Sequence, residues 1–264
     1  PDKYYPTGKR NYARVITTDD YQGTAAAQFL AQEKKVTKCA VLNDNQTYGQ
    51  GLAKAVKDEL VKQGVEVVLD EAWDAKQTSY TALMQKAKTA GADCIYFSGI
   101  YDNNGGQLVK DAAKVLGPAK SFVTMGPDGF TGYPDLQAMP EAEGLLLSFT
   151  GLSQDAIVKN GGAAGKFVAD YTAKYGVPPV GSFSIYAGGA LQVILAAIEA
   201  SDGTRKGVTD AVFSGAGITI PADKSVTGAE ISIDPASGDV KTKTVTIQIM
   251  TGGKETDLMP WAIK

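Results

Sequence analysis

The chain has 264 residues, with 44% hydrophobic and 21% charged side chains, a formal net charge of −3 and a pI of about 5.1. These values are typical of a soluble globular protein with one large domain or two smaller ones. The acidic balance argues against nucleic acid and anionic membrane surfaces as partners. There is no run of about eighteen uninterrupted apolar residues, the length that a membrane-spanning helix needs.

The first part of the chain, up to about residue 150, alternates strand and helix signals. Apolar, β-rich runs predict strands at 13–18, 38–44, 65–73, 92–99, 121–126 and 143–149. Amphipathic segments predict helices at 19–34, 47–64, 79–91 and 104–117. Strands separated by helices are typical of βαβ units, so we expect an α/β fold with a doubly wound parallel sheet.

Three side chains stand just beyond the ends of predicted strands. Tyr48 follows the strand at 38–44, Tyr101 the strand at 92–99 and Asp128 the strand at 121–126. With the common order 2-1-3-4-5, counted from the strand at 38–44, these three strands are neighbours, and ligands bind beyond the carboxyl ends of such strands. Two aromatic rings and a carboxylate suit an ammonium group. Taken singly, each residue could equally be a packed tyrosine or an ordinary turn aspartate.

After residue 150 the pattern changes. Helices are predicted at 155–176, 182–203 and 206–215, a hairpin at 229–250, and a strand end or docked terminus at 261–264. The helix at 182–203 is nearly all apolar, so we expect it to be packed on both sides. No parallel sheet accompanies these helices, so their partner surface must come from the first part of the chain or from further polypeptide.

The inventory of catalytic and cofactor-binding residues is sparse. The sequence contains no histidine, which excludes Ser-His-Asp and Cys-His triads. The sequence has neither the histidines nor the CxxC pair that a zinc site typically uses, so no metal is predicted. The glycine-rich segments match neither a dinucleotide-binding nor a Walker pattern, so no cofactor is predicted; they are TYGQG, NNGGQ and KNGGAAGK. We expect no catalytic residues and a chain that is not an enzyme.

The two cysteines, Cys39 and Cys94, each lie near the start of a predicted strand. A bridge is conceivable if those strands are neighbours, although adjacent parallel strands rarely present good disulfide geometry. Two buried thiols that pack as small apolar residues are the simpler alternative. Both alternatives stay open on the sequence alone.

Several segments form a recognisable set along nearly the whole chain. In order they are TTDDYQG, LNDNQTYGQGLA, CIYFSGIYDNNGGQL, VTMGPDGF, EAEGLLLSF, FVADYTAKYGVPPV, SIYAGGALQVILAAIEA and AEISIDPASGDVKTKTVTIQIM. Together they resemble the bacterial leucine/isoleucine/valine-binding family, the periplasmic type I solute receptors of ABC amino-acid importers. Among these segments, the YGxG and GPDG elements are moderately specific for the family.

The resemblance implies a type I periplasmic-binding-protein fold, in which three crossing strands join two lobes that enclose the ligand. It assigns 17–150 and 226–264 to the second (C-terminal) lobe with the crossing strands, and 1–16 and 151–225 to a remnant of the first lobe. It also implies that about a hundred residues of the first lobe are absent from this chain, which leaves that lobe incomplete. A chain lacking them is expected to bind ligand poorly alone.

The resemblance also implies roles for individual residues. Tyr48 would stack on the ligand, Tyr101 would form a second wall and Asp128 would bind the α-ammonium group of an amino acid. Phe183 would be a ligand-facing aromatic, on a weaker match because its spacing to Tyr186 is two residues short.

The expected function is an extracytoplasmic receptor, free or lipid-anchored, that delivers an aliphatic or branched-chain amino acid to an ABC permease. Its expected partners are the amino acid and the permease, with no nucleic acid, and the complete protein is expected to be a monomer. One alternative is a regulator of the same fold that senses an amide or aromatic acid. Another is an enzyme of flavodoxin-like architecture, which the missing catalytic inventory disfavours.

Overall fold

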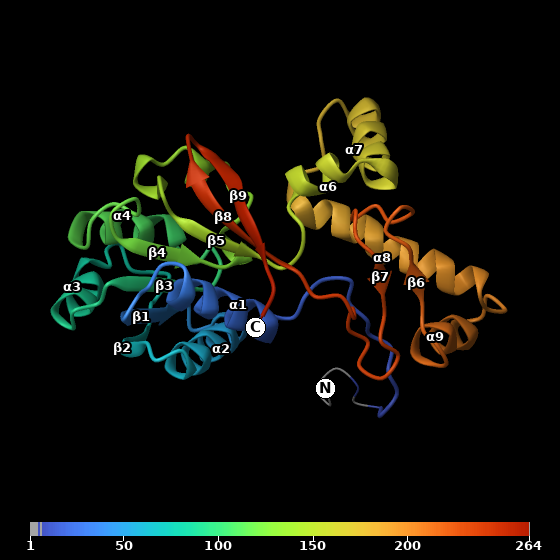
Figure 1. The fold of residues 1–264 in the computed structure, drawn as a ribbon, viewed down its shortest axis with the longest axis horizontal. Helices are drawn as coiled ribbons and strands as arrows, with labels where there is room; N and C mark the ends of the chain where they lie inside the picture. Colours follow the sequence, from blue (N-terminus) through green and yellow to red (C-terminus); the bar gives the residue numbers. More distant parts are fainter. Residues whose placement is uncertain (1–4, 6, 264) are drawn as a thin grey trace. The chain divides into compact units, whose positions relative to one another are not determined.

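The computed structural model describes residues 5 and 7–263. The chain divides into two compact units, which are described separately (Figure 1). The sheet unit contains Asp19–Thr150 and Val245–Lys264, and the helical unit contains Pro1–Thr18 and Gly151–Thr244. The chain therefore passes between the units three times.

The sheet unit is built on a seven-stranded sheet with the order β2-β1-β3-β4-β5-β8-β9. The first five strands in this order are parallel, and β8 and β9 join them as an antiparallel pair. The predicted order 2-1-3-4-5 is confirmed, as is the mixed α/β class. The strands are β1 (Lys38–Asn43), β2 (Glu66–Ala72), β3 (Cys94–Ser98), β4 (Val123–Gly126), β5 (Leu146–Phe149), β8 (Val245–Thr251) and β9 (Lys254–Trp261).

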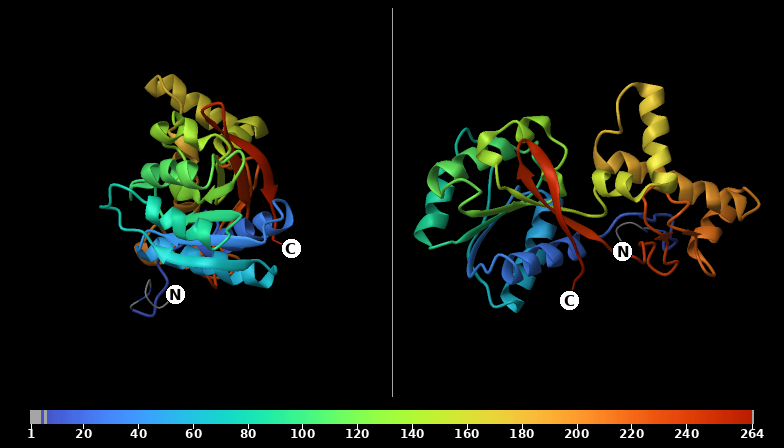
Figure 2. Two further views of the ribbon diagram at one scale, coloured as in Figure 1. Left: turned by 90° about the vertical axis from the view of Figure 1, so that its left-hand side faces the viewer. Right: turned by 45° about the horizontal axis from the view of Figure 1, so that its top comes forward.

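Helices cover both faces of this sheet (Figure 2). Its helices are α1 (Asp19–Gln32), α2 (Thr47–Lys62), α3 (Thr81–Thr89), α4 (Gly105–Val115) and α5 (Pro134–Gln137), with the short 3₁₀ turns η1 (Asp128–Phe130) and η2 (Pro140–Ala142).

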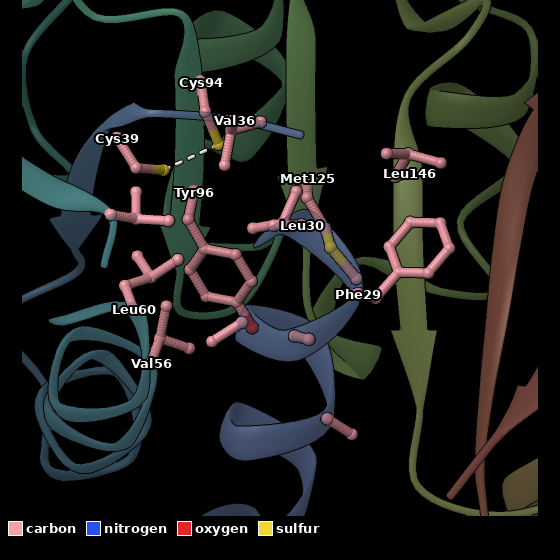
Figure 3. Close-up of a cluster of buried hydrophobic side chains, with 14 of the residues drawn as sticks. Phe29, Leu30, Val36, Cys39, Val56, Leu60, Cys94, Tyr96, Met125 and Leu146 are labelled. Carbon is pink, nitrogen blue, oxygen red and sulfur yellow. Dashed lines mark hydrogen bonds between the residues drawn. The ribbon is translucent and has the colours of Figure 1, made fainter. Parts of the chain in front are cut away.

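Side chains on β1 and β3 alternate between two hydrophobic clusters, because successive residues of a strand point to opposite faces. On β1, Cys39 and Val41 face the cluster formed with α1 and α2, part of which Figure 3 shows. Ala40 and Leu42 face the cluster formed with α3 and α4. Both faces of the strand are buried, which explains its continuous apolar run.

The helical unit contains four helices and a two-stranded ribbon among its described residues. A small core of aliphatic side chains lies where α8, α9 and the ribbon meet. The elements are α6 (Gln154–Asn160), α7 (Gly162–Tyr175), α8 (Gly181–Glu199), α9 (Arg205–Phe213), β6 (Thr219–Ile220) and β7 (Ile231–Ser232).

The expectation that the apolar helix is packed on both sides is wrong for α8. One stripe of the helix packs inward, while four large aliphatic side chains on another stripe are 44–55% exposed: Leu191, Ile194, Leu195 and Ile198. In length and mean hydropathy α8 also resembles a membrane-spanning helix, a property that core helices of soluble proteins share.

Three further expectations need correction. Residues 13–18 form no strand. The helix predicted at 155–176 is two helices, because Gly161 has a φ of +66° that ends α6 before α7 begins. The hairpin predicted at 229–250 is divided: β7 pairs with β6, whereas β8 turns at two glycines into β9.

Because of this division, the last crossing between the two units lies later in the chain than expected. The family resemblance assigns the residues from 226 onwards to the second lobe, whereas residues 226–244 belong to the helical unit and the chain re-enters the sheet unit at Val245. The pairing of β7 with β6 holds this segment in the helical unit, and the bridge between Ile233 and Val240 folds the segment back on itself. The assignment of the two units to the two lobes of the family stays a prediction.

Candidate ligand-binding site

Tyr48 is the second residue of α2, just beyond the carboxyl end of β1. Its neighbour Gly49 lies against the edge of the sheet. A Cβ atom on Gly49 would be 2.1 Å from Asp44 Oδ1 and 2.5 Å from the carbonyl oxygen of Ser98. Only glycine therefore lets the first turn of α2 approach β1 and β3 this closely. This approach places Tyr48 at the edge of the sheet.

The side chain of Asp128 accepts hydrogen bonds from two hydroxyl groups. Tyr48 Oη donates to Asp128 Oδ1 over 2.6 Å, and Thr150 Oγ1 donates to Oδ2 over 2.8 Å. Asp128 opens the turn η1 after β4, and Thr150 directly follows β5. The ends of β1, β4 and β5 thus meet at one carboxylate, which is held in a fixed orientation.

The Tyr48 hydroxyl remains a donor at any ordinary pH. Burial raises its pKa far above the usual range, and the neighbouring charge of Asp128 and the hydrogen bond to it raise it further. The pKa of Tyr96, which lies fully buried on β3, is also raised by burial and then by Asp128. Both phenol groups are therefore neutral and add no negative charge near the carboxylate.

Asp128 has no positively charged partner within residues 5 and 7–263. The ion pairs in this part of the chain all join other side chains. A carboxylate has about four lone-pair positions, of which Tyr48 and Thr150 occupy two. The remaining capacity and the uncompensated charge suit a cationic group that donates hydrogen bonds.

Asp44 is a second carboxylate at this edge, and its surroundings are different. It is buried, and its oxygens accept hydrogen bonds from the backbone amides of Gln46 and Ile100 and from Asn103 Nδ2, over 2.8–3.2 Å. These donors come from the start of α2 and from the segment between β3 and α4. Asp44 therefore fastens the loops of the edge together rather than facing a ligand.

The backbone of Tyr101 joins the same edge, but its ring packs elsewhere. The Tyr101 amide donates to the carbonyl oxygen of Gly129 over 2.8 Å. Its ring lies 4.6 Å from that of Tyr133 and 5.9 Å from that of Phe130, centroid to centroid. Burial, and then the charge of Asp135, raises the pKa of Tyr101.

Tyr101 also lines an open groove of about 690 Å³ over α4 and α5, with Asp102, Lys110, Asp135 and Met139 among its neighbours there. The structure thus brings Tyr48 and Asp128 into direct contact, whereas it directs the Tyr101 ring towards Tyr133 and this groove.

Phe183 lies in the other unit, near the start of α8, and is 48% exposed. Its role as a ligand-facing aromatic stays a prediction. The sequence reasoning overlooked Thr150 and Asp44. Asp44 had a usable signal, because it stands between an apolar run and a helix start. Thr150 had none beyond its place at the end of a predicted strand. No cluster of metal-ligating side chains occurs among the described residues.

Comparisons with known proteins agree with this architecture. The family model described as "Periplasmic binding protein" matches residues 5–248. The Leucine-, isoleucine-, valine-, threonine-, and alanine-binding protein of Pseudomonas aeruginosa is 36% identical over 135 residues, which cover 50% of this chain and 35% of that protein. The Leu/Ile/Val-binding protein of Escherichia coli K12 is 32% identical over 143 residues, which cover 53% of this chain and 38% of that protein.

Solved structures show the same fold over most of the chain. A leucine-binding protein from Thermotoga maritima superposes with a TM-score of 0.77 at 24% identity, covering 94% of this chain and 67% of that one. A solute-binding protein of an ABC transporter from R. palustris, solved with benzoate, superposes with a TM-score of 0.75 at 17% identity. The superposition covers 96% of this chain and 66% of that one.

The chain spans well under half the length of the curated relatives that it matches, and about two thirds of these solved chains. The family match nevertheless extends over almost all of its own length. The expected resemblance is thereby confirmed: the chain belongs to the periplasmic binding protein family.

Proposed function

We propose that this protein is a non-enzymatic, extracytoplasmic solute-binding protein of an ABC importer, and that it captures an amino acid with an aliphatic side chain. The observation that carries the proposal is Asp128, which Tyr48 and Thr150 orient and which has no cationic partner among the described residues. In this proposal Asp128 binds the α-ammonium group of the ligand.

The chemistry of the two groups is complementary. An ammonium group carries three donors, and the free lone pairs of Asp128 accept them as charge-assisted hydrogen bonds. Such a bond contributes about 1.5–3 kcal/mol, roughly a tenfold to hundredfold change in affinity. The hydroxyl groups of Tyr48 and Thr150 donate uncharged hydrogen bonds to the carboxylate, so they fix its position without neutralising its charge. The roles of Tyr101 and Phe183 as aromatic walls stay predictions, and the proposal does not depend on them.

The family relationship supports the choice of ligand and partner. The relative from E. coli is named for leucine, isoleucine and valine, and the relative from P. aeruginosa for these three together with threonine and alanine. An ABC permease in the membrane is the corresponding partner, and the periplasm or the outer cell surface the corresponding location. The sequence has no histidine for general acid–base chemistry, which favours capture of the ligand over its conversion.

A second candidate ligand is an aromatic carboxylic acid. Solute-binding proteins of the same fold have been solved with benzoate and with p-hydroxybenzoic acid, at 17% and 22% identity to this chain. Such a ligand has no ammonium group, and its carboxylate would be repelled by the charge of Asp128. The negative charge of Asp128 therefore favours an amino acid over an aromatic carboxylic acid.

The test is a ligand screen followed by a substitution. A thermal-shift screen of the twenty amino acids, benzoate and p-hydroxybenzoate on the full-length protein identifies the ligand, and calorimetry gives its affinity. We expect leucine, isoleucine or valine to bind, and Asp128→Ala to weaken binding by more than tenfold. Binding of benzoate alone, or an unchanged affinity of the Asp128→Ala variant, would refute the proposal.

A further inference from the structure

Cys39 and Cys94 face each other from two neighbouring strands of the sheet unit, β1 and β3. The two residues are register partners in the parallel pair β1 and β3. Both side chains point into the same hydrophobic cluster, and their sulfur atoms lie 2.6 Å apart (Figure 3). That separation is shorter than a contact between two thiols that share no bond, so the two sulfur atoms are already within bonding reach.

The backbone at this end of the strands is fixed by the residue that precedes Cys94. The carboxylate of Asp93 accepts hydrogen bonds from the amides of Thr37 and Lys38 and from the hydroxyl of Thr37, over 2.7–3.0 Å. The Asp93 amide in turn donates to the carbonyl oxygen of Lys38. The residues directly before both cysteines are therefore clamped in register, and the cysteines cannot slide past each other.

The strand spacing fits a disulfide bond. Neighbouring strands lie about 4.7–4.9 Å apart, and the Cα atoms of bridged cysteines lie about 4.4–6.8 Å apart. The usual difficulty for neighbouring parallel strands is the direction of the side chains. Here the 2.6 Å separation of the sulfur atoms shows that the two side chains are directed towards each other.

We propose that Cys39 and Cys94 form a disulfide bond that joins β1 to β3. Each thiol loses one proton and one electron as the sulfur–sulfur bond forms. The two electrons pass to the disulfide of a thiol–disulfide oxidoreductase, or to glutathione disulfide, which is reduced to two thiols. Members of a periplasmic family mature in an oxidising compartment, where such bonds form and persist.

Burial determines when the bond forms. Both cysteines are 0% exposed in the folded sheet unit. Burial also raises the pKa of the Cys94 thiol well above its usual value, which suppresses the thiolate that carries out exchange. The bond therefore forms while β1 and β3 are still accessible, and it is protected from reductants once α1 and α2 cover that face.

The bond would close a loop that carries part of the candidate site. The two cysteines are 55 residues apart in sequence, and the segment between them contains α2 with Tyr48, β2 and α3. The cross-link lies at the amino ends of β1 and β3, opposite to the edge that carries Tyr48. It stabilises the folded unit by restricting the unfolded chain and takes no part in ligand contact.

Peptide mapping of the full-length protein tests this directly. The protein is exported to the periplasm, purified without reductant, unfolded in the presence of N-ethylmaleimide and digested with trypsin. Cleavage after Lys38 and Lys88 places the two cysteines on separate peptides, 39–54 and 89–110. We expect these peptides to be recovered as one disulfide-linked species, and as two maleimide-labelled peptides after reduction. Labelling of both peptides without reductant would overturn the proposal, as would linkage of either to another cysteine.

Thermal unfolding provides the second measurement. Reduction in denaturant followed by refolding is expected to lower the unfolding midpoint of the sheet unit by at least about 4 °C. The matched control is the double variant Cys39→Ala/Cys94→Ala, whose midpoint should not respond to reduction. An equal response of the wild-type protein and this variant to reduction would contradict the proposal, whatever the absolute stability of the variant.

Discussion

Tyr48 Oη donates a hydrogen bond of 2.6 Å to Asp128 Oδ1, and this bond joins the first turn of α2 to the turn that follows β4. The two residues are 80 positions apart in sequence, and the parallel order of the strands brings them to one edge. The pair defines the candidate site, because it combines a fixed carboxylate with a donor that cannot ionise at ordinary pH.

Substitution of Tyr48 by phenylalanine should weaken amino-acid binding. Tyr48→Phe keeps the ring but removes one of the two hydroxyl groups that orient Asp128, so we expect roughly a fivefold to twentyfold loss of affinity. Calorimetry with the preferred amino acid measures this loss. Tyr175→Phe, at a 58% exposed position on α7, is the control and should bind normally. A Tyr48→Phe variant with wild-type affinity would show that the hydrogen bond does not serve binding.

Thr150 offers a test of orientation that is separate from packing. Thr150→Val removes the hydroxyl that donates to Asp128 Oδ2 but keeps the shape of the side chain, whereas Thr150→Ser keeps the hydroxyl. We expect the valine variant to lose affinity several-fold and the serine variant to retain most of it. If the two variants bound equally, Thr150 would act through its packing alone.

Asp44 should affect stability much more than Asp128 does. Asp44→Ala removes a buried carboxylate and leaves two backbone amides and the side chain of Asn103, all partly buried, without their acceptor, so we expect a loss of about 2–4 kcal/mol in the free energy of unfolding. Asp128→Asn keeps the shape of a half-buried side chain and should cost less than about 1 kcal/mol. Urea denaturation of both variants measures the difference. Equal losses would contradict the separate roles assigned to these two carboxylates.

The sequence predicted the strand order and the placement of Tyr48 and Asp128 at one edge of the sheet, because both follow from one regularity. Apolar runs mark buried parallel strands, and the residues just after them share an edge. The orientation of the Tyr101 ring could not be predicted, because its packing on Phe130 and Tyr133 depends on tertiary contacts. Thr150 was missed for a similar reason, since nothing in the local pattern marks a threonine that donates to a distant carboxylate.

The later part of the chain was harder to predict. Composition alone showed that α8 is apolar, but not that only one stripe of it is covered. The segment at 229–250 has strand signals throughout, and the pattern does not specify which partner each half pairs with. In the structure, β7 pairs with β6, whereas β8 pairs with β5 in the large sheet.

Buried tyrosines predict a loss of stability at alkaline pH. Burial raises the pKa of Tyr186 to about 12, and it raises the pKa of Tyr48 and Tyr96 further. An unfolded tyrosine ionises near pH 10. The folded state therefore favours the neutral phenols, so their contribution is complete below about pH 10 and decreases as the pH rises through 12.

The ultraviolet absorbance of phenolate measures this effect. We expect a fraction of the tyrosines to ionise only when the chain unfolds, and urea denaturation to show decreasing stability above about pH 10. Tyr186→Phe should reduce the dependence on pH, and Tyr175→Phe should leave it unchanged. Ionisation of all tyrosines near pH 10 in the folded protein would contradict the buried environments described above.

The role of Asp128 is tested most directly by a calorimetric cycle with two ligands and two proteins. Leucine and isocaproate, which is leucine with hydrogen in place of the amino group, are each titrated into the full-length wild-type protein and into Asp128→Asn. If Asp128 binds the ammonium group, loss of the amino group should weaken binding to the wild-type protein by at least about tenfold but should change binding to Asp128→Asn little. An equal loss in both proteins would show that the ammonium group is bound elsewhere.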